Sequence, residues 1–334
     1  MKAALTFRAS SIGDSLMGKY LLENVHAQYP DARCVLVVTS RGDMIRNLLA
    51  TYRWLEVREV NRSDLRGLLR LWRDFRNSDL VVTQYAGKGG KFGLGAKLAA
   101  RLLARRGRLI GFVDASNNNR FLYDLLLPFD PKVAMAEHER QALRAAGLPI
   151  CVPYPTLSAI PDSAVLKKFD VTAGRYVVVH PFSGSIKRAL SPAHRKELIA
   201  ALGVAMPGVT LLVSGNAKEA AEAEIACENS GARVIAGKAT LQEMTQLVLQ
   251  SGCVVSLDTG IAHITAQLRR PVLVISICLG RAWWKKPEQY GPDIPAGFYN
   301  HSECASGHVF KDYPDCLNAV DLQEVARAAS KFLV

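Results

Sequence analysis

The sequence predicts an α/β protein built from two doubly wound domains, each a parallel sheet covered by helices on both faces. Short, fully apolar runs alternate with longer amphipathic runs along the chain, as β-strands alternate with α-helices in such sheets. The alternation breaks once, at 148–174, where four prolines and the lack of a hydrophobic period indicate a linker. The length of 334 residues agrees with roughly two domains.

The first predicted domain covers 1–155, and strands and helices alternate within it. Its predicted strands are 3–7, 34–38, 79–84 and 108–113, and its predicted helices are 15–30, 65–75 and 92–107. Pro30 and Gly107 end the first and the last of these helices. In the helix at 65–75, leucines and aromatic residues at helical spacing alternate with arginines, which indicates a core-facing stripe and a solvated face.

The second predicted domain covers 175–319, after a linker at 156–174, and repeats the alternation. Its predicted strands are 176–180, 209–215, 232–237, 253–257 and 271–277, and its predicted helices are 192–206, 217–229, 241–252 and 261–268. A terminal segment, 320–334, is expected to form a helix that packs back toward the first domain. Because ligands of open α/β sheets bind beyond the carboxyl ends of the strands, we expect the two domains to face a central cleft lined by strand-to-helix loops.

The net charge of +12 is concentrated in the first domain. Residues 1–150 hold 24 basic and 14 acidic side chains, whereas residues 151–334 hold 18 and 16. The sequence has no zinc finger and no aromatic-rich RNA-binding signature, which argues against a nucleic-acid partner. An anionic membrane surface or an acidic acceptor explains the excess better, and a merely solvated basic surface is the alternative.

The sequence is typical of a protein that stays in the cytoplasm. No apolar run approaches the roughly 18 residues needed to span a bilayer. Arg8 and Asp14 interrupt the N-terminal apolar stretch, which therefore does not resemble a signal peptide. The seven cysteines include no CxxC pair, as is usual in a reducing compartment.

The sequence does not match several familiar nucleotide-binding and metal-binding motifs. The segment 87–95, GKGGKFGLG, matches neither the phosphate-binding P-loop nor GxGxxG, and the turn after the first strand also lacks the dinucleotide glycine pattern. A nicotinamide-dependent oxidoreductase is therefore disfavoured. Lys88 and Lys91 give this segment a basic character suited to an acidic acceptor, unless it is only a flexible connection. His301, Cys304, His308 and Cys316 have side chains that suit zinc, but their spacing is irregular, so no metal site is predicted.

Two strand-to-helix loops of the second domain suit a diphosphate. After the strand at 176–180, the small residues Ser183, Gly184 and Ser185 let backbone amides approach an anion, and Lys187 adds a cation. Ser191 and Pro192 are typical of the cap and first residue of the next helix.

After the strand at 253–257, Asp258, Thr259 and Gly260 lead into a helix whose free amides favour phosphate oxygens. His263 is four residues from Thr259 and shares its helical face. Simple helix capping is the alternative for this turn, but two such loops in one domain favour a diphosphate-bearing ligand.

These segments resemble the ADP-heptose:lipopolysaccharide heptosyltransferases of glycosyltransferase family nine, which have the GT-B fold of two Rossmann-like domains. The resemblance rests on RASSIGD at 8–14, HPFSGSIKRALSP at 180–192 and, most strongly, the block at 239–275. It implies an inverting transfer of a sugar, heptose in this family, from a nucleotide-diphosphate donor to a lipopolysaccharide core or related acidic glycan. It also implies a metal-independent enzyme, peripheral on the inner face of the bacterial inner membrane, and we expect a monomer.

The resemblance also implies roles for individual residues. Asp14 matches the catalytic carboxylate, and Asp258 matches the residue that holds the donor sugar. The expected donor-binding residues are Ser183, Gly184, Lys187, Glu219, Asp258, Thr259, Gly260 and His263, with Glu219 near the ribose. The expected acceptor-binding residues are Arg8, Ser11, Gly13, Lys88 and Lys91.

Some alternatives stay open from the sequence. Ala189 and Leu190 stand where the family often has a tryptophan, and 276–291 lacks the usual Gly-Pro-Thr-like turn. Another nucleotide sugar or a protein acceptor is therefore possible for a GT-B transferase. Since an Asp at a helix start is often only a cap, a non-catalytic protein that binds a nucleotide sugar or a lipid is the remaining alternative.

Overall fold

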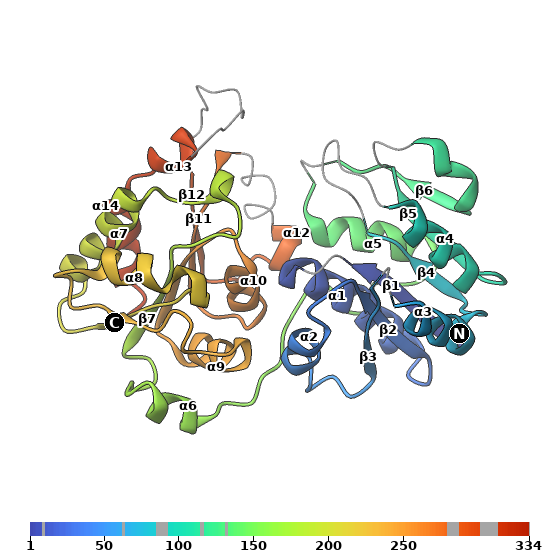
Figure 1. The fold of residues 1–334 in the computed structure, drawn as a ribbon, viewed down its shortest axis with the longest axis horizontal. Coiled ribbons are helices and arrows are strands. Elements are labelled where there is room, and N and C mark those ends of the chain that lie inside the picture. The colour runs from blue at the N-terminus through green and yellow to red at the C-terminus, as the bar shows by residue number, and fades with distance from the viewer. Residues whose placement is uncertain are drawn as a thin grey trace. The chain divides into compact units, whose positions relative to one another are not determined.

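The computed structural model describes residues 1–8, 11–61, 64–84, 93–113, 117–130, 133–278, 287–300 and 313–333. The chain forms two compact units, each with its own six-stranded parallel sheet (Figure 1). Unit 1 comprises Met1–Pro155 and Lys286–Gly291, and unit 2 comprises Thr156–Lys285 and Pro292–Val334. Among the described residues, no helix combines the length and the apolar character needed to cross a membrane.

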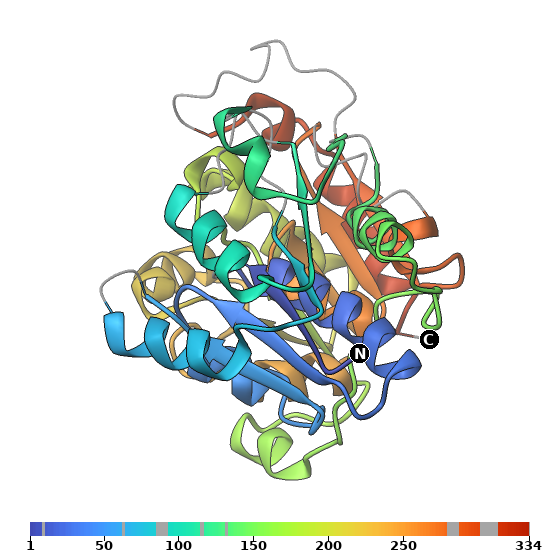
Figure 2. The ribbon, with the colours of Figure 1, turned by 90° about the vertical axis from the view of Figure 1, so that its right-hand side faces the viewer.

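Unit 1 is a sheet of order β3-β2-β1-β4-β5-β6 with helices on both faces (Figures 1 and 2). Its strands are β1 (Ala3–Arg8), β2 (Arg33–Val38), β3 (Leu55–Glu59), β4 (Leu80–Val82), β5 (Arg108–Phe112) and β6 (Leu125–Leu127). Its helices are α1 (Ile12–Gln28), α2 (Gly42–Leu48), α3 (Leu65–Phe75), α4 (Leu94–Leu103), the 3₁₀ turn η1 (Asn117–Leu122), α5 (Met135–Ala145) and α12 (Pro287–Tyr290).

Side chains alternate along the strands of unit 1, so β1 contributes to both faces of the sheet. Leu5 and Phe7 belong to a core that includes Leu71 of α3 and Leu103 of α4. The next residue, Arg8, points to the opposite face, where α1 and α5 contact each other. A polar side chain is therefore buried under α1 at the carboxyl end of the central strand.

Unit 2 is a sheet of order β12-β11-β10-β7-β8-β9. Its strands are β7 (Tyr176–His180), β8 (Thr210–Val213), β9 (Arg233–Val234), β10 (Cys253–Leu257), β11 (Val272–Ile275) and β12 (Ala296–Tyr299). Its helices are α6 (Ser163–Lys168), α7 (Pro192–Ala205), α8 (Ala220–Cys227), α9 (Leu241–Gln250), α10 (Gly260–Gln267), α13 (Asp315–Asn318) and α14 (Leu322–Ser330), with 3₁₀ turns η2 (Ile186–Arg188) and η3 (Ala217–Glu219).

Both sheets have the Rossmann strand order, in which the first strand of the unit lies beside its second and its fourth. The predicted fold class of two doubly wound α/β domains is therefore confirmed. The strands are parallel because helices connect them. Each crossover carries the chain back to the edge of the sheet where the previous strand began.

Helix α14 packs within unit 2. Its apolar stripe, which includes Leu322, Val325 and Ala329, lies in the core of that unit against α7. The expected packing of the terminal segment toward the first domain stays a prediction. The segment that belongs to unit 1 from late in the chain is α12. The side-chain Oε1 of Gln289 on α12 accepts a hydrogen bond from the backbone N of Ala136 at 3.1 Å.

Candidate functional site

The strand order of unit 2 reverses between β7 and β10, because β7 leads on to β8 and β9 on one side and β10 to β11 and β12 on the other. Ligands of such sheets bind outside the carboxyl ends of the two strands at this switch point. The loops that leave these two strands carry seven of the predicted donor residues. They are Ser183, Gly184 and Lys187 after β7, and Asp258, Thr259, Gly260 and His263 after β10.

The loop after β7 is anchored at both ends and open in the middle. Phe182 is buried, and Ser191 caps α7 by accepting a hydrogen bond from the backbone N of His194, which confirms the predicted cap. Lys187 is exposed and has no ion-pair partner among the described residues. A Cβ placed on Gly184 would meet no atom within 4 Å, so there is free space beside this backbone.

The loop after β10 leads into α10, whose first amides have no side-chain cap among the residues that the structure describes. Thr259 occupies the N-cap position, but its hydroxyl lies 3.2 Å from the Ser256 hydroxyl instead of capping the helix. The Nε2 of His263 lies 3.7 Å from Oδ1 of Asp258, and both side chains are partly exposed. A helix N-terminus beside an imidazole suits phosphate oxygens, and the carboxylate suits sugar hydroxyls.

Glu219 has a local structural role. Its Oε2 accepts a hydrogen bond from the backbone N of Asn216 at 2.7 Å and closes a capping box at η3. A Cβ on Gly215 would lie 3.0 Å from the same oxygen, so this turn is tightly packed. The predicted contact of Glu219 with the ribose stays a prediction, and one of its two oxygens is already bonded.

Sequence reasoning missed His180, the last residue of β7. Its Nδ1 lies 3.0 Å from the hydroxyl of Ser214, which follows β8, and it pairs in register with Ser256 of β10. Removal of the ring from water lowers the pKa of His180 to about 4, so the ring is neutral at physiological pH. A histidine at the carboxyl end of an otherwise apolar strand was the signal that could have found it.

Unit 1 places Asp14 at its own switch point, between β1 and β4. Ser11 caps α1 by accepting a hydrogen bond from the backbone N of Asp14 at 3.1 Å, and its hydroxyl donates to Oδ2 of Asp14 at 2.6 Å. The second oxygen, Oδ1, has no hydrogen-bond partner in the described part of the chain. The carboxylate therefore binds the capping hydroxyl with one oxygen and keeps the other available for a proton. Gly13 lies in the same first turn.

The prediction that Arg8 contacts the acceptor does not fit its position. Its guanidinium is fully buried, and its Nη2 donates to Oε2 of Glu139 at 2.6 Å. Gly18 makes this burial possible, because a Cβ there would lie 2.8 Å from Cγ of Arg8. Burial raises the pKa of Glu139 to about 7 although Arg8 opposes the shift, and the charge of Asp14 raises it further. The buried pair thus lies within electrostatic reach of the candidate base.

We expect replacement of Glu139 by glutamine to change how stability depends on pH. The unfolded carboxyl titrates near 4.3, so between about pH 5 and pH 7 the folded protein binds more protons than the unfolded chain. The free energy of unfolding of the wild type should therefore fall as pH rises through this window, by up to about 3 kcal/mol. Glutamine does not titrate, so the stability of the Glu139→Gln variant lacks this dependence on pH. The variant should therefore gain stability relative to the wild type between pH 5 and pH 8.

Urea denaturation of both proteins across this range measures the difference. A variant that loses stability relative to the wild type as pH rises would show that the ion pair with Arg8 outweighs the burial of the carboxylate.

Other predicted residues cannot be placed. Lys88, Lys91, His301, Cys304 and His308 lie outside the described residues. Cys316 is buried in unit 2. Within the described ranges, no three His, Cys, Asp or Glu side chains gather in a cluster suited to a metal ion.

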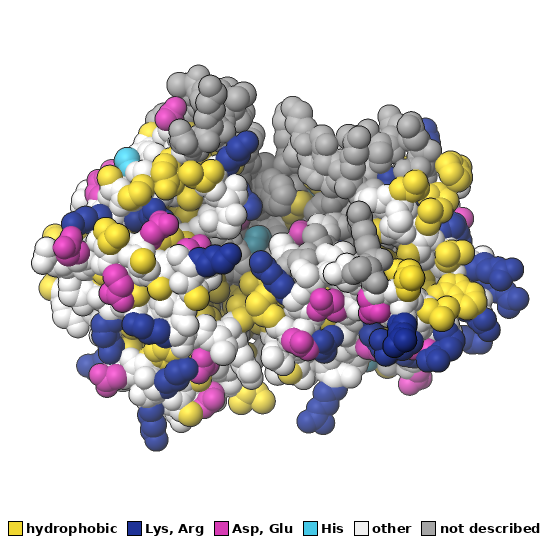
Figure 3. All heavy atoms as spheres, in the orientation of Figure 1, with side chains coloured by type: hydrophobic (Ala, Val, Ile, Leu, Met, Phe, Trp, Pro, Cys, Tyr) yellow, Lys and Arg dark blue, Asp and Glu magenta, His cyan; other side chains and the backbone are white. Residues whose placement is uncertain are grey.

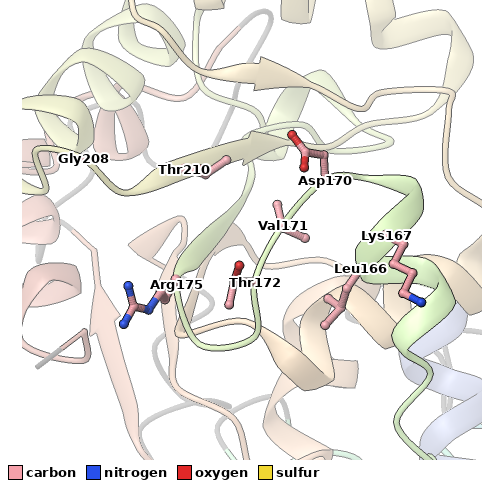
Figure 4. Close-up of a pocket in the computed structure, with 8 residues that line it drawn as sticks. All are labelled: Leu166, Lys167, Asp170, Val171, Thr172, Arg175, Gly208 and Thr210. Atoms are coloured by element: carbon pink, nitrogen blue, oxygen red, sulfur yellow. The ribbon is translucent and has the colours of Figure 1, made fainter.

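A pocket of about 350 Å³ lies at the opposite edge of the unit 2 sheet, near the amino ends of β7 and β8 (Figure 4). Its lining includes Lys167, Asp170 and Arg175. Figure 4 shows the side chains of Lys167 and Arg175 pointing away from each other. No charged groups converge in it, so the switch point is the better candidate site.

Comparison with known proteins agrees with this placement. Residues 131–276 match the family model described as glycosyltransferase family 9 (heptosyltransferase). This range includes β7, β10 and both loops of the unit 2 switch point. No curated protein sequence gives a significant match to the chain.

Solved structures share the fold along the whole chain. The family 9 glycosyl transferase from Veillonella parvula has a TM-score of 0.75 at 12% identity, covering 99% of this chain and 97% of its own. The ADP-heptose LPS heptosyltransferase II of E. coli has a TM-score of 0.74 at 18% identity, covering 100% and 98%. The E. coli heptosyltransferase WaaC, solved with ADP, has a TM-score of 0.59 at 19% identity, covering 82% and 86%.

The two Rossmann-like units are thus shared with GT-B heptosyltransferases, and the family match lies over the loops of the unit 2 switch point. Residues 131–276 of this chain are therefore similar to glycosyltransferase family 9 (heptosyltransferase), and the fold of the whole chain is that of the solved glycosyltransferases it matches.

Proposed function

We propose that the protein transfers heptose, with inversion, from ADP-heptose to a lipopolysaccharide core or a related acidic glycan. The observation that carries the proposal is that Lys187, Asp258 and His263 lie on the two loops that leave the adjacent strands of one switch point. The solved neighbours support the choice of donor, since one is an ADP-heptose LPS heptosyltransferase and another was solved with ADP.

In this proposal the donor diphosphate lies against the start of α10. Its oxygens accept hydrogen bonds from the free amides there, and Lys187 and His263 add positive charge. Asp258 accepts hydrogen bonds from the sugar hydroxyls. Because the protein itself supplies donors and cations to the leaving group, we propose that no metal is required.

The chemical step in this proposal is a direct displacement. The acceptor hydroxyl oxygen attacks the anomeric carbon while Oδ1 of Asp14 takes the hydroxyl proton. The bond between that carbon and the diphosphate oxygen breaks, and the electron pair leaves with the nucleoside diphosphate. The products are the inverted glycoside, the nucleoside diphosphate and a proton held on Asp14.

We propose an acidic acceptor because the protein's excess of positive charge lies in its first 150 residues. An acidic glycolipid would place the protein at the cytoplasmic face of the inner membrane, bound peripherally.

A thermal-shift screen of nucleoside diphosphates and nucleotide sugars tests the proposed donor. We expect ADP and ADP-heptose to raise the melting temperature, since a ligand at about 100 times its Kd stabilises by about 2.7 kcal/mol. Transfer from ADP-heptose should then proceed equally well with and without EDTA.

Uridine and guanosine diphosphates serve as controls and should give smaller shifts. Stabilisation by one of these in place of ADP would overturn the donor, and loss of transfer in EDTA would overturn metal independence.

A further inference from the structure

Unit 1 leaves six large apolar side chains uncovered on three neighbouring elements. They are Leu65 and Leu69 on α3, Leu94, Leu98 and Leu102 on α4, and Phe121 on η1, and we call them the leucine face. Each is between 44% and 80% exposed. Helix α4 contacts both α3 and η1, so the three elements are adjacent.

The spacing of the leucine face shows that it is a second apolar side of these helices. Leu94, Leu98 and Leu102 recur every four residues and so lie along one side of α4. Another side of the same helix, with Ala100 and Leu103, is already buried in the core. The core-facing stripe expected for α3 accounts for its buried residues only, and the outer leucines need another explanation.

The leucine face is bordered by exposed arginines. Arg66, Arg70, Arg105, Arg106 and Arg120 are exposed, and none has a carboxylate partner among the residues that the structure describes. Helix α4 itself contains no acidic residue. Figure 3 shows hydrophobic side chains gathered over the part of unit 1 that carries α4 and η1, with Lys and Arg side chains beside them.

We propose that the leucine face docks on an anionic lipid bilayer, with its leucines and Phe121 in the interface and the arginines on lipid phosphates. Apolar anchors bordered by cations are the combination that partitions into such an interface. A second copy of the chain fits less well. A two-fold contact would bring the basic borders of both copies together, and α4 carries no acidic residue to compensate their charge.

The docking needs neither the proposed donor nor the proposed acceptor, so vesicles that contain no glycolipid test it independently of glycosyl transfer. The full-length protein is sedimented with phosphatidylcholine vesicles that either contain or lack phosphatidylglycerol. We expect binding only to the anionic vesicles, and weaker binding in roughly 0.5 M salt, where the Debye length is about 4 Å.

The triple variant Leu94→Gln, Leu98→Gln, Leu102→Gln should bind anionic vesicles at least about tenfold more weakly, because three apolar anchors are removed. The double variant Arg66→Ser, Arg70→Ser should lose affinity mainly at low salt. The control is Val204→Gln, Ile225→Gln, which changes two apolar residues of unit 2 that are more exposed than the three leucines and should bind as the wild type does.

All the substituted side chains are exposed, so melting curves should match that of the wild type. Equal binding by the triple variant and the control would overturn the proposal. So would equal binding to neutral and anionic vesicles. A wild-type dimer that the triple variant abolishes, without any vesicle binding, would assign the leucine face to self-association instead.

Discussion

Replacing Asp14 by asparagine is expected to lower kcat/KM for glycosyl transfer by about 10²–10⁴ while leaving the Kd of the free nucleoside diphosphate unchanged. The amide keeps the size and one acceptor oxygen of the carboxylate, so the bond from the Ser11 hydroxyl can persist. What it cannot do is take a proton through the second oxygen. Asp14 belongs to unit 1 and the diphosphate loops to unit 2, so donor affinity should not depend on it.

Asp43→Asn is the matched control for this change. Asp43 is also an acidic residue in the first turn of a helix of unit 1, and its side chain is 91% exposed. It should retain wild-type kinetics. Steady-state rates and calorimetry of both variants make the comparison, and normal turnover by Asp14→Asn would remove this carboxylate from the mechanism.

The fold and the main loops of the candidate site could be predicted because local patterns determine them. Apolar runs as short as the one at 176–180 become strands with the predicted bounds, and Ser191 with Pro192 begins α7 as capping preferences require. The convergence of the loops after β7 and β10 then follows from the strand order of a doubly wound sheet.

The buried pair under Asp14 could not be predicted from local patterns. Arg8 and Glu139 are separated by 131 residues, and no periodicity connects them. Helix α5 was not predicted either, because its sequence is rich in charged residues although the helix is largely buried. The packing of α14 on α7 could not be predicted either, because an apolar stripe predicts that a helix packs but not on which sheet.

Lys187→Ala and Asp258→Ala are expected to weaken donor use in different ways. Removal of Lys187 takes away one of the two side-chain cations of the loop after β7, so it should weaken binding of both the free nucleoside diphosphate and the nucleotide sugar. A charge-assisted hydrogen bond of about 1.5–3 kcal/mol corresponds to a loss of roughly 10- to 100-fold in affinity.

Removal of Asp258 should mainly affect the sugar-bearing donor. Its carboxylate lies at the start of α10, where it would repel the phosphates of a free diphosphate and accept hydrogen bonds only when a sugar is present. Affinity for the free diphosphate should therefore stay unchanged or rise slightly in Asp258→Ala, whereas affinity for the nucleotide sugar falls by roughly tenfold or more.

Calorimetry with ADP and with ADP-heptose measures both losses in each variant. Lys196→Ala is the control for removal of a lysine from unit 2, since Lys196 lies on α7 and pairs with Glu228 at 3.3 Å. It should bind both ligands as the wild type does. Equal losses of diphosphate affinity in Lys187→Ala and Asp258→Ala would contradict the division of roles, because a carboxylate that only holds the sugar contributes nothing to binding a ligand without one.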